Sequence, residues 1–264
     1  MPPAAETDWN RSASFRFYEE LNDFLPRENR KRAFDYAFNG TPAVKDAIEA
    51  IGVPHTEVDL ILVDGVSVGF AHLLQGGERV AVYPTFERLD ISPLNRLRPQ
   101  PLREPRFILD VHLGKLARYL RLAGFDAAYG DEADDAAIAA RAAAEHRIVL
   151  TRDVGLLKRG CVTHGYWLRS SEPRRQLAEV VDALDLRSRL RPFSRCSVCN
   201  TPLVDVPEPL VRAALPPGIR GRYERIARCP GCGRSYWPGS HYERLARLIG
   251  DLAAASDEPS APTQ

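Results

Sequence analysis

The sequence contains no long apolar run, and its first residues do not combine a cationic start with an apolar segment. A membrane-spanning helix needs about 18 or more consecutive apolar residues, and a secretory signal peptide needs the charged and apolar start. We therefore expect neither a membrane span nor a signal peptide. A cytoplasmic location is the prediction that follows.

Cysteine is scarce, with five residues in a chain of 264. Four of them form two Cys-x-x-Cys pairs, Cys196 with Cys199 and Cys229 with Cys232. In a reducing compartment such pairs are typical of metal ligands, and the doubling of the motif disfavours a disulfide or redox pair. Four thiolates form a closed, tetrahedral site for one structural Zn²⁺. The remaining cysteine, Cys161, is predicted to be a small core residue.

The spacing of the two pairs predicts an unusual zinc ribbon. The 29 residues between them exceed the usual ribbon spacing, so an elaborated finger is expected there. Gly231 and Gly233 permit tight turns that point backbone N–H groups at the sulfur atoms. With four cysteines supplied, His241 is not needed as a ligand.

Charge is distributed unevenly, although the chain is 44% hydrophobic and 27% charged, as in a globular protein with more than one core. Residues 187–247 carry twelve arginines against four acidic residues, a local excess of eight positive charges in a chain of net charge +1. A basic module suggests a polyanionic partner, of which nucleic acid is the commonest. A solvated, arginine-rich surface is an equal alternative on charge alone.

The N-terminal segment predicts two strands, a helix, a hairpin and a closing strand. The expected elements are strands in 13–21 and 30–38, a helix over 41–52, a hairpin over 57–69 that turns at Asp64-Gly65, and a strand at 78–84. The helix is predicted to begin with Thr41 as N-cap and Pro42 at its first position, and to stop at Gly52. This order resembles a ubiquitin-like β-grasp domain, similar to small sulfur carriers. Those carriers use a free C-terminal Gly-Gly, whereas Gly76 and Gly77 are expected in a turn before the last strand.

Acidic residues follow the strands predicted in the next segment. Strands are expected at 106–110, 125–129 and 147–151, with helices at 111–124 and 135–146. Alternating strands and helices predict a parallel sheet with right-handed crossovers, whose sites form at the carboxyl ends of the strands. The acids at those ends are Asp110 after the first strand, Asp131, Glu132, Asp134 and Asp135 after the second, and Asp153 after the third.

Carboxylates that converge on one sheet edge repel one another unless a divalent cation holds them. Oxygen ligands suit Mg²⁺ or Mn²⁺, and two such ions roughly 4 Å apart can activate a water for phosphodiester cleavage. Thr151 is then expected to hydrogen-bond a carboxylate or a metal-bound water, and Arg152 to contact a phosphate. Helix capping is an equal alternative for Asp134 or Asp135, and Asp110 could equally begin its helix.

Cations and rings are the candidate substrate-binding residues. Lys115, Arg118 and Arg121 are spaced by three and are expected to share the outer side of the helix at 111–124, while its inner side carries Leu113, Leu116, Ala117 and Leu120. In the basic segment, arginines such as Arg222, Arg225 and Arg228 are interleaved with Tyr223, Tyr236, Trp237 and Tyr242. Cations for phosphates and rings for base stacking suit single-stranded nucleic acid, although rings can equally pack the small core of the ribbon.

Four stretches together resemble a known family: FILDVHLGKLARYLRLAGFD, DEADDAAIAARAAAEHRIVLTRD, CSVCN and RCPGCGRSYWPGSHYERL. Over residues 106–247 the chain resembles the ribonuclease domain family named after the C-terminal domain of the mut-seven exonuclease. The resemblance implies a PIN-like nuclease fold with an added zinc ribbon, and bacterial members often have a ubiquitin-like domain in front. It also implies that Asp110, Asp135 and Asp153 are the acidic metal ligands, with Asp134 a close substitute for Asp135. Many PIN nucleases have a further acid shortly after the last Asp, whereas residues 154–157 are Val-Gly-Leu-Leu, so Asp131 or Asp134 is the candidate fourth carboxylate.

These observations predict an α/β protein with three modules. The expected ranges are a ubiquitin-like β-grasp domain at 12–90, a linker at 91–105, a PIN-like parallel-sheet domain at 106–186, a zinc ribbon at 187–247 and a disordered tail at 248–264. The predicted function is a ribonuclease that uses Mg²⁺ or Mn²⁺ to cleave single-stranded RNA, with the β-grasp domain as a recognition or packing module for a protein partner.

Three other functions are weighed against this prediction. The main alternative is a non-catalytic RNA-binding or ribosome-associated adaptor on the same fold. A sulfur-transfer accessory protein lacks the free Gly-Gly end. A haloacid-dehalogenase-type phosphatase is disfavoured because Asp110-Val111-His112 breaks the Asp-x-Asp motif of that class.

Overall fold

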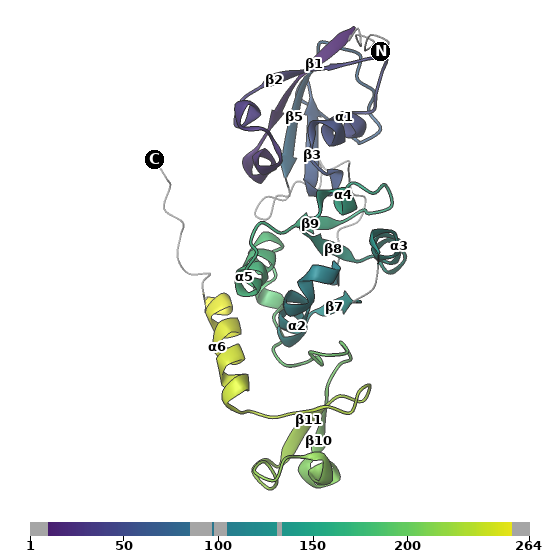
Figure 1. Ribbon diagram of the computed structural model, residues 1–264. Helices are drawn as coiled ribbons and strands as arrows, with labels where there is room; N and C mark the ends of the chain where they lie inside the picture. The colour runs from purple at the N-terminus through teal and green to yellow at the C-terminus, as the bar shows by residue number, and fades with distance from the viewer. Residues whose placement is uncertain (1–9, 85–96, 98–104, 131–133, 255–264) are drawn as a thin grey trace, which may run out of the picture. The chain divides into compact units, whose positions relative to one another are not determined.

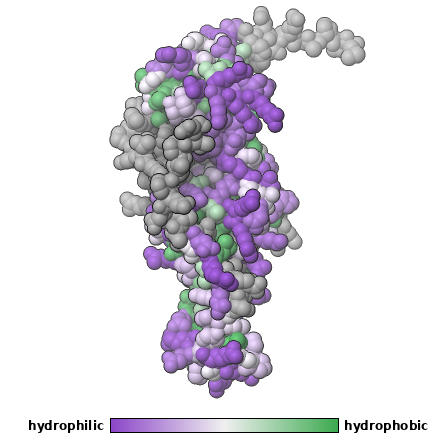
Figure 2. Space-filling view, turned by 90° about the vertical axis from the view of Figure 1, so that its left-hand side faces the viewer, coloured by the Kyte–Doolittle hydropathy of each residue, from purple (hydrophilic) through white to green (hydrophobic). Residues whose placement is uncertain are grey.

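The computed structural model describes residues 10–84, 97, 105–130 and 134–254 (Figure 1). The chain divides into two compact units, one formed by Met1–Arg103 with Asp153–Trp167 and the other by Glu104–Arg152 with Leu168–Gln264. On the face drawn in Figure 2, the described surface is mostly hydrophilic, and hydrophobic residues occupy small separate areas. None of the helices in the described ranges is long and apolar enough to span a bilayer.

The first unit contains a five-stranded mixed sheet. Its strands are β1 (Arg11–Phe17), β2 (Phe34–Phe38), β3 (Val58–Val63), β4 (Val66–Val68) and β5 (Arg79–Pro84), in the order β2-β1-β5-β3-β4. β1 and β5 are parallel, and the other pairs are antiparallel. The β-grasp-like arrangement predicted from the sequence is therefore confirmed.

Apolar alternation explains how this sheet packs on helix α1 (Val44–Ile51). Phe15 and Phe17 of β1 are buried in one cluster with Val44 and Ile48 of α1. Successive strand residues point to opposite faces, so the aromatic residues of β1 share the inner face.

Turn residues in this unit have the conformations that their sequence suggests. Asp64 and Gly65 have φ of 49° and 84°, which suits the predicted tight hairpin between β3 and β4. Gly76 and Gly77 also have positive φ, 99° and 92°, and Gly77 N–H donates to Ser12 O at 2.7 Å. The Gly-Gly pair therefore lies in a turn before β5, as predicted.

The predicted start of α1 is wrong by two residues. The helix begins at Val44 with Ala43 as its N-cap, rather than with Thr41 and Pro42. The preceding backbone is paired elsewhere: Val44 N–H donates to His72 O at 2.7 Å, and Leu74 N–H donates to Pro42 O at 3.0 Å. The end of the helix is as predicted, because Gly52 follows Ile51 with φ of 130°.

A second sheet has the order β7-β6-β8-β9. Its strands are β6 (Arg106–Leu109), β7 (Asp126–Tyr129), β8 (Ile148–Thr151) and β9 (Gly165–Trp167), with helices α2 (Gly114–Leu122), α3 (Asp135–Glu145), α4 (Val154–Leu157) and α5 (Pro173–Ala183). β6 pairs in parallel with both β7 and β8. Because β7 and β8 lie on opposite sides of β6, right-handed crossovers place α2 and α3 on opposite faces of the sheet (Figure 1). The predicted parallel α/β domain is confirmed.

Helix α2 has the predicted inner side but not the predicted outer side. Leu113, Leu116, Ala117 and Leu120 are all buried, as expected. Arg121, however, is only 6% exposed, whereas Lys115 and Arg118 are exposed. The prediction that these three cations share an outer side is wrong for Arg121, because its guanidinium binds carbonyl groups of another segment.

The third sheet is antiparallel and carries the four cysteines at its margins. It consists of β10 (Val204–Pro207), β11 (Arg225–Arg228) and β12 (Ser235–Tyr236), in the order β10-β11-β12. Short 3-10 helices at Glu208–Leu210 and Arg212–Ala214 lie between β10 and β11, which is the elaborated finger expected from the spacing. Val211, Leu215 and Ile226 form a small core there.

Two further predictions differ from the structure. The predicted tail at 248–264 begins inside helix α6 (Ser240–Ala254), because apolar residues such as the buried Ile249 continue the helix. Cys161 is exposed rather than part of a core. Residues 255–264, Asp131 and the linker at 91–105, apart from Leu97 and Pro105, lie outside the described residues.

Candidate functional site

The carboxyl ends of β6 and β8 bring two predicted site residues together. Leu109 of β6 is opposite Leu150 of β8, so the residues that follow them lie side by side. Thr151 Oγ1 donates a hydrogen bond of 2.9 Å to Asp110 Oδ2, and Asp110 N–H donates to Leu150 O at 3.2 Å. Thr151 is fully buried while Asp110 is half-buried. The hydroxyl therefore orients the carboxylate from the core side, as expected for Thr151.

Asp134 and Asp135 stand at the N-terminus of α3. Asp134 is exposed and caps the helix, with its Oδ1 accepting a hydrogen bond of 2.7 Å from Ala137 N–H. Asp135 is the first helical residue and is half-buried. The capping alternative thus describes Asp134, since capping satisfies one of the first N–H groups of the helix.

Asp153 follows β8 and caps the short helix α4. Its Oδ1 accepts a hydrogen bond of 2.7 Å from Gly155 N–H, and both Asp153 and the neighbouring Arg152 are exposed. Asp110, Asp135 and Asp153 do not form a group of three ligand atoms within 4.8 Å among the residues that the structure describes. The structure brings Asp110 to Thr151 but does not gather the three carboxylates into a preformed cluster.

Tyr129 is a residue of this sheet edge that the sequence analysis missed. It ends β7 opposite Leu109 of β6, and its hydroxyl donates to Val111 O at 2.7 Å. A Cβ added to Gly114 would lie 2.9 Å from the Tyr129 hydroxyl, so glycine lets the ring approach the start of α2. Its position in the sequence could have indicated this. Tyr129 is the last residue of β7, and Leu109, which precedes Asp110, is the last residue of β6.

The four cysteines of the two knuckles form the one metal-ligand group found among the described residues. The ligand atoms of Cys196, Cys199, Cys229 and Cys232 all lie within 4.8 Å of one another. The Sγ atoms of Cys196 and Cys232 are 3.5 Å apart, and those of Cys199 and Cys229 are 3.3 Å apart. Tetrahedral Zn–S bonds of about 2.3 Å separate sulfurs by roughly 3.8 Å. The cluster is therefore compatible with a structural zinc ion.

The two knuckles are built by matching turns. Asn200 N–H donates to Cys196 O at 3.0 Å, and Gly233 N–H donates to Cys229 O at 2.9 Å. Asn200 and Gly233 have φ of 68° and 74°, a left-handed conformation that Asn and Gly adopt readily. Gly231 has a different role, because an added Cβ there would lie 2.6 Å from Thr201 Oγ1 of the facing knuckle.

The thiols of the cluster differ in pKa. Hydrogen bonds with the Thr201 side chain and backbone lower the pKa of Cys199 to about 6. The Arg234 N–H favours the Cys232 thiolate, but burial and hydrogen bonds with the other three cysteines raise the pKa of Cys232 to about 12. Four adjacent thiolates repel one another, so a divalent cation is what allows all four to ionise at neutral pH.

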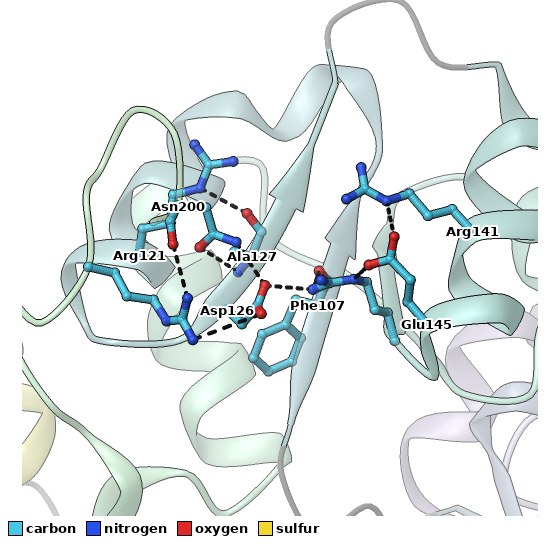
Figure 3. Close-up of polar contacts among 9 residues, drawn as sticks. Phe107, Arg121, Asp126, Ala127, Arg141, Glu145 and Asn200 are labelled. Atoms are coloured by element: carbon cyan, nitrogen blue, oxygen red, sulfur yellow. Dashed lines mark hydrogen bonds and ion pairs between the residues drawn. The ribbon is translucent and has the colours of Figure 1, made fainter. Parts of the chain in front are cut away.

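The first knuckle is bound to edge strand β7 by two side chains (Figure 3). Arg121 Nε donates to Ala127 O at 2.8 Å, while Nη1 of the same guanidinium donates to Val198 O at 2.6 Å. Asn200 Oδ1 accepts from Ala127 N–H at 3.2 Å. Both backbone groups of Ala127 on the outer edge of the sheet are thereby paired, and the knuckle is attached to the parallel-sheet domain.

Asp126, at the amino end of β7, binds both Asn200 of the first knuckle and Arg147, which precedes β8. Its Oδ1 accepts from Arg147 Nη1 at 2.7 Å and from Asn200 Nδ2 at 2.8 Å, as Figure 3 shows. Burial by itself raises the pKa of Asp126, but the hydrogen bonds from Arg147 and Asn200 outweigh it and hold the pKa below its usual range. Arg147 also donates to Phe107 O at 3.1 Å. The network lies at the amino ends of the strands, away from the end that carries Asp110.

The arginines predicted to bind phosphate differ in their surroundings. Arg222 is exposed, and Arg228 on β11 is half-buried. Arg225 forms an ion pair with Asp205, and its Nη2 donates to Asp205 O at 2.8 Å. The positive charge of Arg225 is therefore balanced by Asp205. The sequence had grouped Arg225 with Arg222 and Arg228 as residues available to phosphates.

The interleaved rings all have contacts within the protein. Tyr223 and Trp237 pack against the small core of the ribbon. The Tyr236 hydroxyl is 3.0 Å from Cys196 Sγ, and the Tyr242 ring stacks on Phe193 with centroids 3.8 Å apart. Packing of the ribbon core thus describes Tyr223 and Trp237, whereas Tyr236 contacts the cysteine cluster and Tyr242 stacks on Phe193.

Comparison with protein families agrees with this architecture. The chain matches the model described as Mut7-C RNAse domain over residues 105–249 and the model described as Mut7-C ubiquitin over residues 10–90. Comparisons with curated proteins and with solved structures gave no match. The first family match covers more than half of the chain and, like the second, includes the elements described above. The chain therefore belongs to the Mut7-C RNase domain family, with a Mut7-C ubiquitin-like domain ahead of the RNase domain.

Proposed function

We propose that this chain is a divalent-metal-dependent ribonuclease that cleaves single-stranded RNA. The observation that carries the proposal is the hydrogen bond between Thr151 and Asp110 at the carboxyl ends of adjacent parallel strands, in a chain of an RNase-domain family. Sites of open parallel sheets form at this edge. A buried hydroxyl that orients a half-buried carboxylate is the kind of preorganisation that a metal ligand needs.

The proposed ligands of Mg²⁺ or Mn²⁺ are Asp110, Asp135 and Asp153, with Asp134 as a substitute for Asp135. Carboxylate oxygens fit these hard cations. When bound, the cation supplies an activated water and stabilises the leaving oxygen. Thr151 holds Asp110 in place, and the bond from Gly155 N–H holds one oxygen of Asp153.

Cations on neighbouring elements are proposed to hold the phosphates of the substrate. Lys115 and Arg118 are exposed on α2, and Arg152 is exposed beside Asp153. Positive side chains near a carboxylate site bring the anionic backbone of RNA to it and orient the scissile phosphate.

The four cysteines are proposed to bind one structural Zn²⁺. The sulfur separations and the matching turns support this assignment. The ion would hold the ribbon in the conformation in which Asn200 reaches Ala127, so zinc would also maintain the attachment of the ribbon to β7.

A metal titration tests the proposed activity. Labelled single-stranded RNA and DNA of one sequence are incubated with the zinc-loaded protein while Mn²⁺ or Mg²⁺ is raised, with a chelator added at the end. We expect cleavage of RNA that rises with the metal concentration and stops with the chelator. Binding of RNA without cleavage at any concentration of either metal would contradict the proposal.

A non-catalytic RNA-binding adaptor is the second candidate. It is favoured by the finding that the cysteines, and not the carboxylates, form the metal-ligand group among the described residues. The arginine excess of residues 187–247 would then carry the whole function. The metal titration separates the two candidates, because only the ribonuclease cleaves.

The basic segment is expected to bind RNA largely through phosphates. Replacing Arg222, Arg225 and Arg228 together with Gln should weaken RNA binding and flatten its dependence on salt. Each lost phosphate contact reduces the slope of log K against log salt by about 0.7 for a single strand, so two contacts give about 1.4 and three would give about 2. Because Asp205 balances Arg225, we expect the loss to come mainly from Arg222 and Arg228.

A control variant changes charge elsewhere. Arg27, Lys31 and Arg32 are exposed in the ubiquitin-like domain, and their replacement with Gln changes the net charge by the same amount. Binding is measured by fluorescence anisotropy from about 50 to 200 mM salt. Equal slopes for wild-type protein and the ribbon variant would show that these arginines are only solvated surface.

A further inference from the structure

The segment that follows β8 packs with the ubiquitin-like domain. Asp153–Trp167 lies within the residues matched by the RNase-domain family, yet it belongs to the same compact unit as Met1–Arg103. The segment comprises α4, the loop after it and β9, and it begins with Asp153. The contacts of this segment within that unit are specific, and they come from three places.

A buried histidine of the ubiquitin-like domain binds the loop after α4. His55 is 5% exposed, and its Nε2–H donates to Val162 O at 2.8 Å. Nδ1 of the same ring is 2.5 Å from Glu49 Oε1 on α1, so the carboxylate fixes the orientation of the ring. Val162 itself is fully buried. The contact joins residues 107 positions apart in the sequence.

Lys158 makes the second contact, immediately after α4. Its Nζ donates to Glu49 O at 2.6 Å. Glu49 of α1 therefore contacts this segment through its backbone carbonyl, while its side chain orients His55. Burial lowers the pKa of Lys158, with Glu49 opposing that effect. A half-buried ammonium group directed at one backbone carbonyl constrains the end of α4.

β9 supplies the third contact. Trp167 N–H donates to Glu57 Oε1 at 2.5 Å, and the Trp167 ring lies 5.0 Å from the Phe24 ring between centroids. A Cβ at Gly165 would lie 2.5 Å from Leu157 Cδ2 and 3.4 Å from Thr56 Cβ. Glycine at this position therefore allows β9 to lie close to both α4 and the ubiquitin-like domain.

Between these anchors, α4 has little freedom of its own. Leu156 and Leu157 are fully buried, and the helix has only four residues, with Asp153 as its N-cap. A helix this short is not stable by itself and takes its orientation from what it packs against. The direction of the Asp153 carboxylate thus depends on the residues that hold the segment from 158 to 167.

We propose that the ubiquitin-like domain is a positioning element for the nuclease site, because His55, Glu49 and Lys158 hold the segment that carries Asp153. This inference rests on the proposed role of Asp153 as a metal ligand. Lys158 and His55 are positioning residues in it, since they act through Asp153 and do not touch the substrate. The ubiquitin-like domain is then an internal activator of the RNase domain.

The test uses Lys158→Met in the full chain, which keeps most of the side-chain volume and removes the donor to Glu49 O. We expect the affinity for Mn²⁺, measured by calorimetry on zinc-loaded protein, to fall about tenfold, as is usual when a residue that orients a metal ligand is lost. RNA affinity should be unchanged, hydrogen exchange at residues 154–157 should become faster, and Lys158→Arg should restore the wild-type Mn²⁺ affinity. Lys31→Met, an exposed lysine in the same unit, is the matched control.

Each result bears on the inference separately from the proposed function. Wild-type Mn²⁺ affinity in Lys158→Met, together with faster exchange in α4, overturns the positioning role. If exchange is not faster, the double variant Lys158→Met with Trp167→Ala is measured, because it also removes the contact with Phe24. An unchanged Mn²⁺ affinity in the double variant overturns the positioning role as well. A wild-type chain that binds Mn²⁺ but cleaves no RNA contradicts the proposed ribonuclease alone, whereas absence of Mn²⁺ binding outside the cysteine site removes the basis of both.

Discussion

Replacing Asp153 with Asn should reduce cleavage of single-stranded RNA by about 100-fold or more while the protein stays folded. The substitution removes the negative charge that binds the cation, and without the cation no water is activated and no leaving oxygen is stabilised. The structure makes Asn the informative replacement. Asp153 Oδ1 accepts the Gly155 N–H at 2.7 Å, and an Asn side chain can accept the same bond because Asn and Asp cap helices about equally well.

The expected stability of this variant separates a metal ligand from a plain cap. Asp153 is exposed, and Asn keeps an acceptor for the Gly155 N–H, so we expect Asp153→Asn to cost little stability. Asp153→Ala removes the cap as well as the charge and should lower the free energy of unfolding by about 1 kcal/mol more than Asp153→Asn. Binding of RNA should persist in both variants, because the arginines of the ribbon are unchanged.

Cleavage is measured in single-turnover reactions at saturating Mn²⁺, per folded molecule, next to a thermal melt of each variant. Asp46→Asn is the control, since Asp46 is an exposed aspartate in the first turn of α1. If Asp153→Asn melts at a lower temperature yet cleaves at the wild-type rate, Asp153 is a capping residue only.

The second large effect is expected at Cys229, a fully buried member of the cysteine cluster. Cys229→Ser should abolish binding of the proposed zinc ion and unfold much of the ribbon. Zinc contributes roughly 10 kcal/mol or more to the folding of small zinc domains, far more than the small core of Val211, Leu215 and Ile226 can supply. The β6–β8 sheet should remain folded, because its own core does not depend on the ribbon.

Loss of zinc should also loosen one edge of that sheet. Asn200 and Arg121 pair the outer backbone groups of Ala127 only while the first knuckle keeps its turn. We therefore expect faster hydrogen exchange at Ala127 in Cys229→Ser, whereas Leu109 and Leu150 in the middle of the sheet should stay protected.

Zinc content by mass spectrometry and limited proteolysis of residues 187–254 measure this effect. Cys161→Ser is the control, because Cys161 is exposed and outside the cluster. Full zinc content and wild-type resistance to protease in Cys229→Ser would contradict the zinc assignment.

The sequence by itself determined the features that depend on short stretches of chain. Strands followed by Asp110 and Asp153, the Asp64-Gly65 turn and the two cysteine knuckles all agree with the structure, because each depends on the conformational preferences of neighbouring residues. The family follows from the same local motifs. The proposed carboxylate ligands also come from these strand ends, although the structure adds only the contact of Asp110 with Thr151.

Tertiary structure alone decided which of these local features interact across the chain. Arg121 looked like one of three surface cations, but it is buried because it donates to carbonyl groups of residues 197 and 198, 76 and 77 positions away. The start of α1 shifted because residues 72–74 pair with the backbone before it. The attachment of the segment after Asp153 likewise uses carbonyl groups, because His55 donates to Val162 O and Lys158 donates to Glu49 O. Every residue has such a carbonyl group, so the choice of partner leaves no trace in the side-chain pattern, and only the packing of distant elements selects it.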